Sequence, residues 1–311
     1  MEILFLSPVF KQMIWGGDRL GKDWPYQIPG DDTGECWAVS AHPSGDCTIK
    51  NGTFAGQTLS SLWDNHRELF GNIQGDRFPL LVKIIDAKAD LSIQVHPDDI
   101  YANIHENGSL GKTESWYILD ATEDAGLVVG HNARTEEELK DMIHNAKWNE
   151  FIREVPISAG DFIQIDPGTV HAIKGGIMLL ETQQNSDITY RVYDYDRLSN
   201  GKPRELHVEK SIDVITVPAK SVEECISKVD NSITNRPNLL ISNQYYRVWK
   251  LDVENSMTWE MQTPFTIMSV IDGDGTIDGI PITKGDHFIL PYGYAKAEFT
   301  GNLSLIISTV Q

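Results

Sequence analysis

Short apolar stretches separated by polar turns run through most of the chain. Phe78–Ile85 is a mostly apolar stretch, and in Leu91–His96 apolar and polar residues alternate, as in a half-buried strand. Further segments of strand-like pattern and length are Ser115–Leu119, Leu127–Val129, Phe162–Ile165, Ile177–Thr182, Tyr245–Val253, Phe265–Ile271 and Leu303–Val310. Many short strands between Gly/Pro turns predict a mainly β protein of the jelly-roll kind.

Two segments show helical spacing instead. Near 135–152, the run Thr135-Glu136-Glu137-Glu138 has the form of a capping box and precedes apolar residues at helical intervals. Residues 58–70 form a second amphipathic pattern, with leucines and Trp63 on one face. We expect both helices to cover the sheets and assign them no chemistry.

An internal repeat indicates two related β modules. Gly160–Gly168 is echoed by Gly285–Gly293, and each copy reads as a turn, an apolar strand and a Pro/Gly turn. The first copy continues to His171, whereas the second continues to Lys296. Residues near 215–240 are rich in polar and turn-forming residues, as in a linker. Each copy resembles the second motif of the cupin family, with a histidine only in the first copy. The resemblance implies a cupin-like module over 1–217 that carries a metal, and a second over 236–311 that carries none.

Composition narrows the possible partners. Among 311 residues, 45 are acidic and 26 basic, which gives a formal net charge of −19. Nucleic acid and anionic membranes need a basic face, so neither is predicted as a partner. No apolar run reaches the ~18 residues of a membrane span, no basic leader opens the chain, and the three cysteines are scattered. A cytoplasmic protein is expected, in which a few local cations can still hold an anionic small molecule.

One pattern is typical of a metal site. On a strand, Gln94 and His96 lie on the same face, with Ile93 and Val95 on the other. His171 follows a Pro-Gly turn, and Glu114 begins a predicted strand. Two imidazoles, a carboxylate and an amide oxygen can bind zinc and leave a position for solvent. Isolated histidines are more often ordinary core or surface residues, so spacing alone leaves both interpretations open.

A resemblance adds to this pattern. Four motifs occur in order: QVHPDD at 94–99, GKTESWYIL at 111–119, IDPGTVHAI at 165–173 and SDITYRVYDYDR at 186–197. With WGG at 15–17 and GECW at 34–37, the chain resembles the type I mannose-6-phosphate isomerases of the cupin superfamily, in their short bacterial form. The resemblance covers about residues 5 to 200. The chain has Thr113 where that family commonly has proline.

The resemblance implies a site and a reaction. It implies that one zinc ion per chain is bound by Gln94, His96, Glu114 and His171. It also implies an essential arginine at Arg191, with Lys83 and Lys112 beside the metal. The reaction would interconvert mannose 6-phosphate and fructose 6-phosphate through an enediol-type intermediate. The carbon base stays open among a zinc-bound water, Asp187 and a lysine. Ser109 and Arg134 are the candidate phosphate contacts.

Two other classes of protein fit part of the pattern. Two histidines and a carboxylate also describe the iron site of a cupin oxygenase, although an oxygenase has no need of Lys112 and Arg191. A sugar-binding cupin without turnover would bind ligand and exchange no isomers. In each interpretation except the oxygenase, the expected partner is a small sugar or sugar phosphate. The oligomeric state is not predicted.

Overall fold

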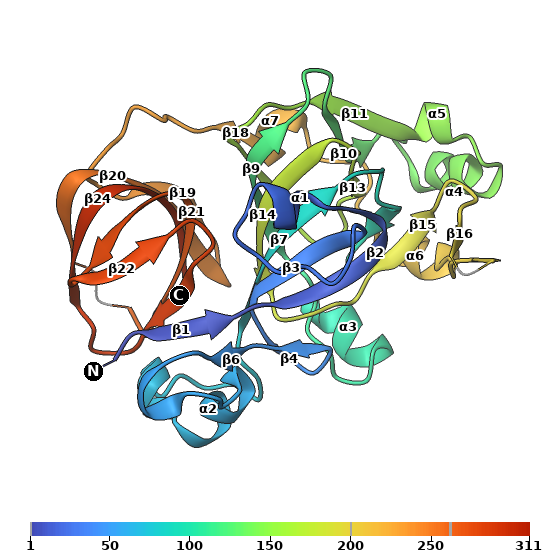
Figure 1. Ribbon diagram of the computed structural model, residues 1–311. Helices are drawn as coiled ribbons and strands as arrows, with labels where there is room; N and C mark the ends of the chain where they lie inside the picture. The colour runs from blue at the N-terminus through green and yellow to red at the C-terminus, as the bar shows by residue number, and fades with distance from the viewer. Residues whose placement is uncertain (1, 200, 261–262) are drawn as a thin grey trace.

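Three β-sheets organise the computed structural model, which describes residues 2–199, 201–260 and 263–311 (Figure 1). The first sheet has the strand order β18-β12-β9-β14-β7-β2-β3. Its strands are β2 (Val9–Gly17), β3 (Thr33–Val39), β7 (Leu80–Ala87), β9 (Glu114–Ala121), β12 (Asp161–Ile165), β14 (Ile177–Gln184) and β18 (Ile226–Lys228). The mainly β fold expected from the sequence is confirmed.

The second sheet faces the first and has the order β11-β10-β13-β8-β15. Its strands are β8 (Ile93–Val95), β10 (Gly126–His131), β11 (Ile152–Pro156), β13 (His171–Ile173) and β15 (Tyr190–Tyr193). Two short ribbons lie outside the large sheets: β4 (Ala41–His42) with β5 (Gly45–Asp46), and β16 (Leu198–Ser199) with β17 (Lys202–Pro203).

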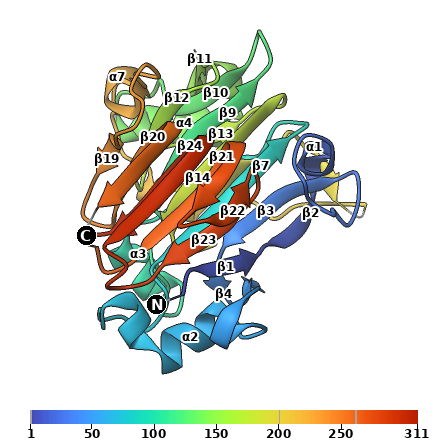
Figure 2. The same cartoon turned by 60° about the vertical axis from the view of Figure 1, so that its left-hand side comes forward.

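The third sheet, at the left of Figure 1, curls around a hydrophobic core of its own. Its order is β19-β20-β24-β21-β23-β1-β6, with β22 beside β21. The strands are β1 (Leu4–Ser7), β6 (Thr48–Ile49), β19 (Asn238–Ser242), β20 (Tyr246–Glu260), β21 (Thr266–Ile277), β22 (Ile280–Thr283), β23 (His287–Leu290) and β24 (Lys296–Val310). Figure 2 shows β20, β24 and β21 as long neighbouring strands.

The sheets cross the module limits expected from the sequence. Strand β1 belongs to the third sheet, where Leu4 is paired with Ile289 of β23. Strand β18 lies beyond residue 217 but pairs with β12 in the first sheet. The expected limits of 1–217 and 236–311 therefore do not coincide with the sheets. The pairing of β1 is non-local, so no pattern within residues 1–10 could indicate it.

Both predicted helical segments are present, and each is divided. Residues 58–70 form α2 (Leu59–Asn65) and the 3₁₀ turn η2 (Arg67–Phe70), and Thr58 caps α2 through a hydrogen bond from the Ser61 N–H. The segment near 135–152 forms α4 (Glu136–His144) and α5 (Trp148–Phe151). These two helices are separated at Ala146, whose φ of 52° is left-handed.

The remaining helices are short and lie at the ends of strands. They are α1 (Arg19–Lys22), η1 (Gly52–Phe54), α3 (Asp99–His105), α6 (Val208–Val214) and α7 (Val222–Cys225). Within the described part of the chain, no helix has the length and apolar character needed to cross a membrane.

The two-residue period of the first sheet determines what faces its partner. In β9, Trp116 and Ile118 pack against the second sheet, whereas Tyr117 packs on the opposite side, toward the third sheet and α2. Strands β7 and β14 alternate in the same way. Lys83, Glu114 and Glu181 each lie two residues from a side chain that packs between the first and second sheets, namely Ile85, Trp116 and Leu179. All three therefore face the space between these sheets.

Candidate metal centre

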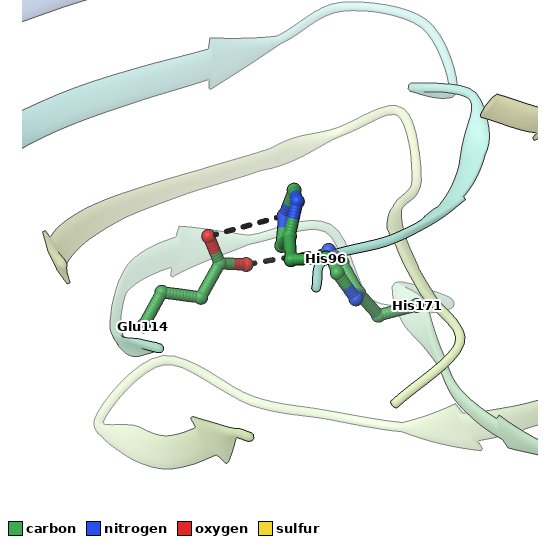
Figure 3. A group of neighbouring side chains, drawn as sticks. All are labelled: His96, Glu114 and His171. Atoms are coloured by element: carbon green, nitrogen blue, oxygen red, sulfur yellow. Dashed lines mark ion pairs between the residues drawn. The ribbon is translucent and has the colours of Figure 1, made fainter. Parts of the chain in front are cut away.

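Three side chains converge in that space. His96, which follows β8, His171, which begins β13, and Glu114, which begins β9, offer ligand atoms that all lie within 4.8 Å of one another. Glu114 Oε2 lies 3.5 Å from His96 Nε2, and Glu114 Oε1 lies 3.3 Å from His171 Nε2 (Figure 3). All three side chains are buried. Gln94 is paired with His171 across the strands, and its amide nitrogen lies 3.2 Å from His171 Nε2.

Backbone carbonyls fix the orientation of both imidazoles. His96 Nδ1 lies 2.8 Å from the Ile188 carbonyl oxygen, and His171 Nδ1 lies 2.9 Å from that of Thr169. A carbonyl only accepts, so each Nδ1 carries the proton and each Nε2 presents a lone pair toward Glu114. Two lone pairs facing a carboxylate repel it unless a cation lies among them. The donor set therefore fits a bound metal ion, with the outer hydrogen bonds usual for ligating histidines.

The ammonium group of Lys112 supplies positive charge to this cluster. Its Nζ lies 2.6 Å from Glu114 Oε2 and 3.3 Å from His96 Nε2. Burial opposes ionisation of Glu114, but the charge of Lys112 outweighs burial and holds the pKa of the carboxyl well below its usual range. Burial and Lys112 lower the pKa of His96 to about 3, and burial also lowers that of His171. Both imidazoles are thus neutral near pH 7, as metal binding requires.

A narrow cavity adjoins the cluster. Gln94 and Lys112 lie in its wall, together with Met13, Trp15, Glu35, Lys83, Ile85, Leu91, Ser92, Ile173, Glu181, Thr189, Arg191 and Arg204. The lining includes both apolar and charged side chains. Lys83, Lys112 and Arg191 lie in this wall together with Gln94.

Lys83 is held between two carboxylates. It is the cross-strand partner of Glu181, and its Nζ lies 3.3 Å from Glu181 Oε2 and 3.9 Å from Glu35 Oε2. The indole of Trp37 lies beneath the ammonium at 5.1 Å and donates a hydrogen bond to Glu35. Burial alone would lower the pKa of Lys83, but Glu35 and Glu181 raise it above its ordinary value. Lys83 is therefore charged and paired, which is how a buried lysine is tolerated.

Sequence reasoning assigned no role to three charged residues of this wall: Glu35, Glu181 and Arg204. Glu181 interrupts the apolar run of β14 in the same manner as Lys83 interrupts that of β7, and this interruption is the signal that could have indicated it. Burial raises the pKa of Glu181. Its Oε1 accepts a hydrogen bond of 3.1 Å from the Trp116 indole, whereas its Oε2 accepts none among the described residues.

The guanidinium groups of Arg191 and Arg204 both lie in the cavity wall. Asp194 accepts hydrogen bonds from both Arg197 and Arg204, with 2.7 Å from Arg204 Nε to Oδ2. Within the described residues, Arg191 forms no ion pair, and its buried Nε lacks a hydrogen-bond partner. Burial and the charge of Arg204 lower the pKa of Arg191. Two cations close together favour an anion between them.

Other candidates lie outside this wall. The carboxylate of Asp187 accepts a hydrogen bond from Ser44 and lies 3.5 Å from His42 Nε2, with its side chain 44% exposed. Ser109 lines a separate cleft, and Arg134 precedes α4. Neither Ser109 nor Arg134 adjoins the cavity beside the cluster, so the structure does not support them as phosphate contacts.

Taken together, a cupin fold and a buried His–Glu–His cluster beside a charged cavity define a metal-binding enzyme of the cupin class. The catalytic-domain model of type I phosphomannose isomerase matches residues 3–129, and the cupin-domain model of mannose-6-phosphate isomerase matches residues 236–310. The chain belongs to the type I phosphomannose isomerase family.

Individual relatives are similar over nearly the whole chain. The identity is 51% to mannose-6-phosphate isomerase ManA of Bacillus subtilis, over 99% of this chain and 98% of that protein. It is 45% to mannose-6-phosphate isomerase of Streptococcus mutans, with the same coverage. A crystal structure of mannose 6-phosphate isomerase from Bacillus subtilis superposes with a TM-score of 0.93 at 47% identity, covering 99% of each chain. A mutant phosphomannose isomerase from Salmonella typhimurium shares the fold, with a TM-score of 0.80 at 14% identity and coverage of 99% and 100%.

Proposed function

We propose that this protein interconverts mannose 6-phosphate and fructose 6-phosphate, with one zinc ion bound by Gln94, His96, Glu114 and His171. The observation that carries the proposal is the buried His–Glu–His cluster at the edge of a cavity with charged groups of both signs. Such a cavity suits a sugar phosphate, whose reacting oxygens and phosphate both need fixed cations. The names of the similar proteins support the same substrate pair.

Zinc suits the donor set because two imidazole nitrogens and a carboxylate without thiolates are typical of catalytic zinc. Rotation of the Gln94 amide by 180° would turn its oxygen toward His171 and the cluster. When bound, zinc supplies Lewis-acid charge that polarises the sugar carbonyl.

We assign the proton transfer between C1 and C2 to Glu181. A carboxyl group whose pKa is raised can both accept and return a proton near neutral pH. The atom that would carry the proton is Oε2, which accepts no hydrogen bond from the described residues and forms an ion pair with Lys83 Nζ at 3.3 Å. Asp187 is less suited because it is half-exposed and already bonded to Ser44.

The cations have separate tasks in this scheme. Lys112 donates hydrogen bonds to a sugar oxygen on which negative charge develops. Arg191 has an unpaired Nε for the same purpose. The phosphate is assigned to Arg204, whose Nε and Nη2 are bound to Asp194, so its remaining Nη1 is available to an anion.

The test is turnover of mannose 6-phosphate by protein of defined metal content, with coupled detection of fructose 6-phosphate. Activity should disappear on chelation, return with zinc and collapse in Arg191→Ala. Zinc-loaded, folded protein that binds the sugar phosphate without isomer exchange would contradict the proposal and favour a sugar-binding cupin. Oxygen consumption by iron-loaded protein would favour the oxygenase.

A further inference from the structure

One tyrosine just before β20, Tyr245, connects the third sheet by hydrogen bonds to the segment that carries Lys112 and Glu114. Tyr245, which precedes β20, donates a hydrogen bond of 2.9 Å from its hydroxyl to Asp99 Oδ2. Both residues line a cleft of about 460 Å³ that is separate from the cavity beside the metal cluster. Burial and Asp99 raise the pKa of Tyr245 to about 12, so the hydroxyl keeps its proton as a donor at physiological pH.

Asp99 connects this hydroxyl to two further groups. It is the first residue of α3, three positions after His96. Its other oxygen, Oδ1, accepts 2.8 Å and 3.0 Å hydrogen bonds from the Gly111 N–H and the Gln184 amide. Gly111 approaches the backbone of residues 97–99 so closely that an added Cβ would lie 2.4 Å from the Asp98 carbonyl carbon. This contact therefore has little room to move.

Gln184 completes the connection. The side-chain oxygen Oε1 of Gln184 accepts a 2.9 Å hydrogen bond from the Thr113 backbone N–H, and the backbone N–H of Gln184 donates to the Thr113 carbonyl at 3.0 Å. Between them, the Lys112 N–H donates to the Pro97 carbonyl at 3.0 Å. Three successive amides, 111 to 113, are thus fixed immediately before Glu114. A proline at position 113 would lack the donor that binds Gln184.

We propose that Tyr245 is a positioning residue for the reaction, which holds the Lys112–Glu114 segment in register through Asp99 and Gln184. The third sheet thereby gains a role in the site, although none of the residues that we place in the cavity or the metal cluster belongs to that sheet. The zinc and kinetic readouts below rest on the proposed function. The amide-exchange readout does not.

The experiment compares Tyr245→Phe with Tyr294→Phe. Both variants lose a hydroxyl that donates to an aspartate, but the Tyr294 hydroxyl binds Asp278 within the third sheet. Hydrogen–deuterium exchange is measured for the amides of residues 111–113, zinc affinity by competition with a chromogenic chelator, and kcat and KM by the coupled assay. Asp99→Asn is the second variant, should Tyr245→Phe fold poorly.

We expect Tyr245→Phe to accelerate exchange at residues 111–113 while other strands keep their protection. Zinc affinity should fall roughly tenfold, which is the lower end of the effect of losing an outer-shell partner of a metal site, and kcat should fall with KM little changed. Tyr294→Phe should resemble the wild type in every readout. Equal exchange and equal zinc affinity in the two tyrosine variants would overturn the proposal. Wild-type protein without zinc binding or turnover, combined with the expected exchange difference, would overturn the proposed function and leave the positioning role supported.

Discussion

One oxygen of Glu181 accepts a hydrogen bond from the Trp116 indole, and the other forms an ion pair with the ammonium group of Lys83. Replacement of Glu181 by glutamine keeps the shape and the Trp116 contact but removes the ability to accept a proton. We expect kcat to fall about 10²- to 10⁴-fold, the usual contribution of a positioned acid–base group. The measurement is the coupled isomerase assay, with zinc content as the control that should stay near the wild-type value. The assay is run well below the melting temperature of the variant, because glutamine also removes one carboxylate partner of Lys83.

The matched comparison for this prediction is Asp187→Asn. If the Glu181 variant keeps its turnover and the Asp187 variant loses it, Asp187 carries out the proton transfer and our assignment to Glu181 is wrong.

Lys83 gives a second prediction, about stability. Without its ammonium, Glu181 and Glu35 would lie near each other with no cation of Lys83 between them. Breaking a buried ion pair from one side destabilises by about 3–5 kcal/mol, so Lys83→Met should lower the free energy of unfolding by that order. Urea unfolding measures it. The double variant Lys83→Met with Glu181→Gln should recover part of the loss, whereas additive losses would show that the two residues are not coupled.

At the residue scale, the motifs of the sequence indicated Gln94, Lys83, Lys112 and Arg191 in the cavity wall. They gave no role to Glu35, Glu181 or Arg204. The i, i+2 spacing of Gln94 and His96 placed them on one face because strand periodicity is local. Glu181 was missed because only the cross-strand register, with Lys83 opposite it, shows that its charge is paired. Arg204 was missed because it lies outside all of the quoted motifs. It is positioned by the ribbon β16–β17 and by its hydrogen bonds to Asp194, which a sequence pattern does not show.

Among the elements, β23 carries a buried histidine that predicts a pH effect. His287 Nε2 lies 2.7 Å from the Tyr26 hydroxyl, and Nδ1 lies 2.9 Å from Ser269 Oγ, so the ring joins the loop before β3 to the third sheet. Burial and the charge of Lys50 lower the pKa of His287 to about 3. In the unfolded chain the pKa of a histidine is about 6.5, so below that pH the unfolded chain binds a proton at His287 while the folded ring stays neutral. The free energy of unfolding therefore falls as the pH drops toward 3.

We therefore expect His287→Gln to flatten the pH dependence of unfolding. Between pH 6.5 and pH 5 the wild type should lose about 2 kcal/mol more than the variant, because one proton contributes about 1.4 kcal/mol per pH unit. Urea midpoints at the two pH values measure this difference. If the free energy of unfolding depends on pH equally in the two proteins, the pKa of His287 does not differ between the folded and unfolded states and the prediction is wrong.

The elements themselves were largely predictable, and their ends and partners were not. The capping threonines before α2 and α4 are local signals, and both helices begin where these residues indicate. Ala146, which separates α4 from α5, carries no helix-ending signal such as glycine, so the break depends on tertiary packing. The repeat indicated β12 and β23 correctly, but no pattern along the chain indicated that β20 and β24 would extend to 15 residues each.

For the whole molecule, metal binding should be measurable as stability. The ligands come from both sheets, β8 and β13 on one side and β9 on the other, so an ion bound among them links the sheets. At a free zinc concentration ~1,000 times Kd, the gain is about 4 kcal/mol. Chelation should therefore lower Tm by roughly 5–10 °C, and zinc should restore it. His171→Ala should show little zinc-dependent change, and an equal shift in that variant would place the stabilising ion elsewhere.

The pairing of β1 with β23 has a consequence for how the chain is made. The partner of Leu4, Ile289, is translated about 285 residues after it. The edge of β1 that pairs with β23 therefore lacks its partner while those residues are synthesised, although the other edge can pair with β6 much earlier. Contacts so distant in sequence slow folding, and an exposed strand edge invites association with other chains.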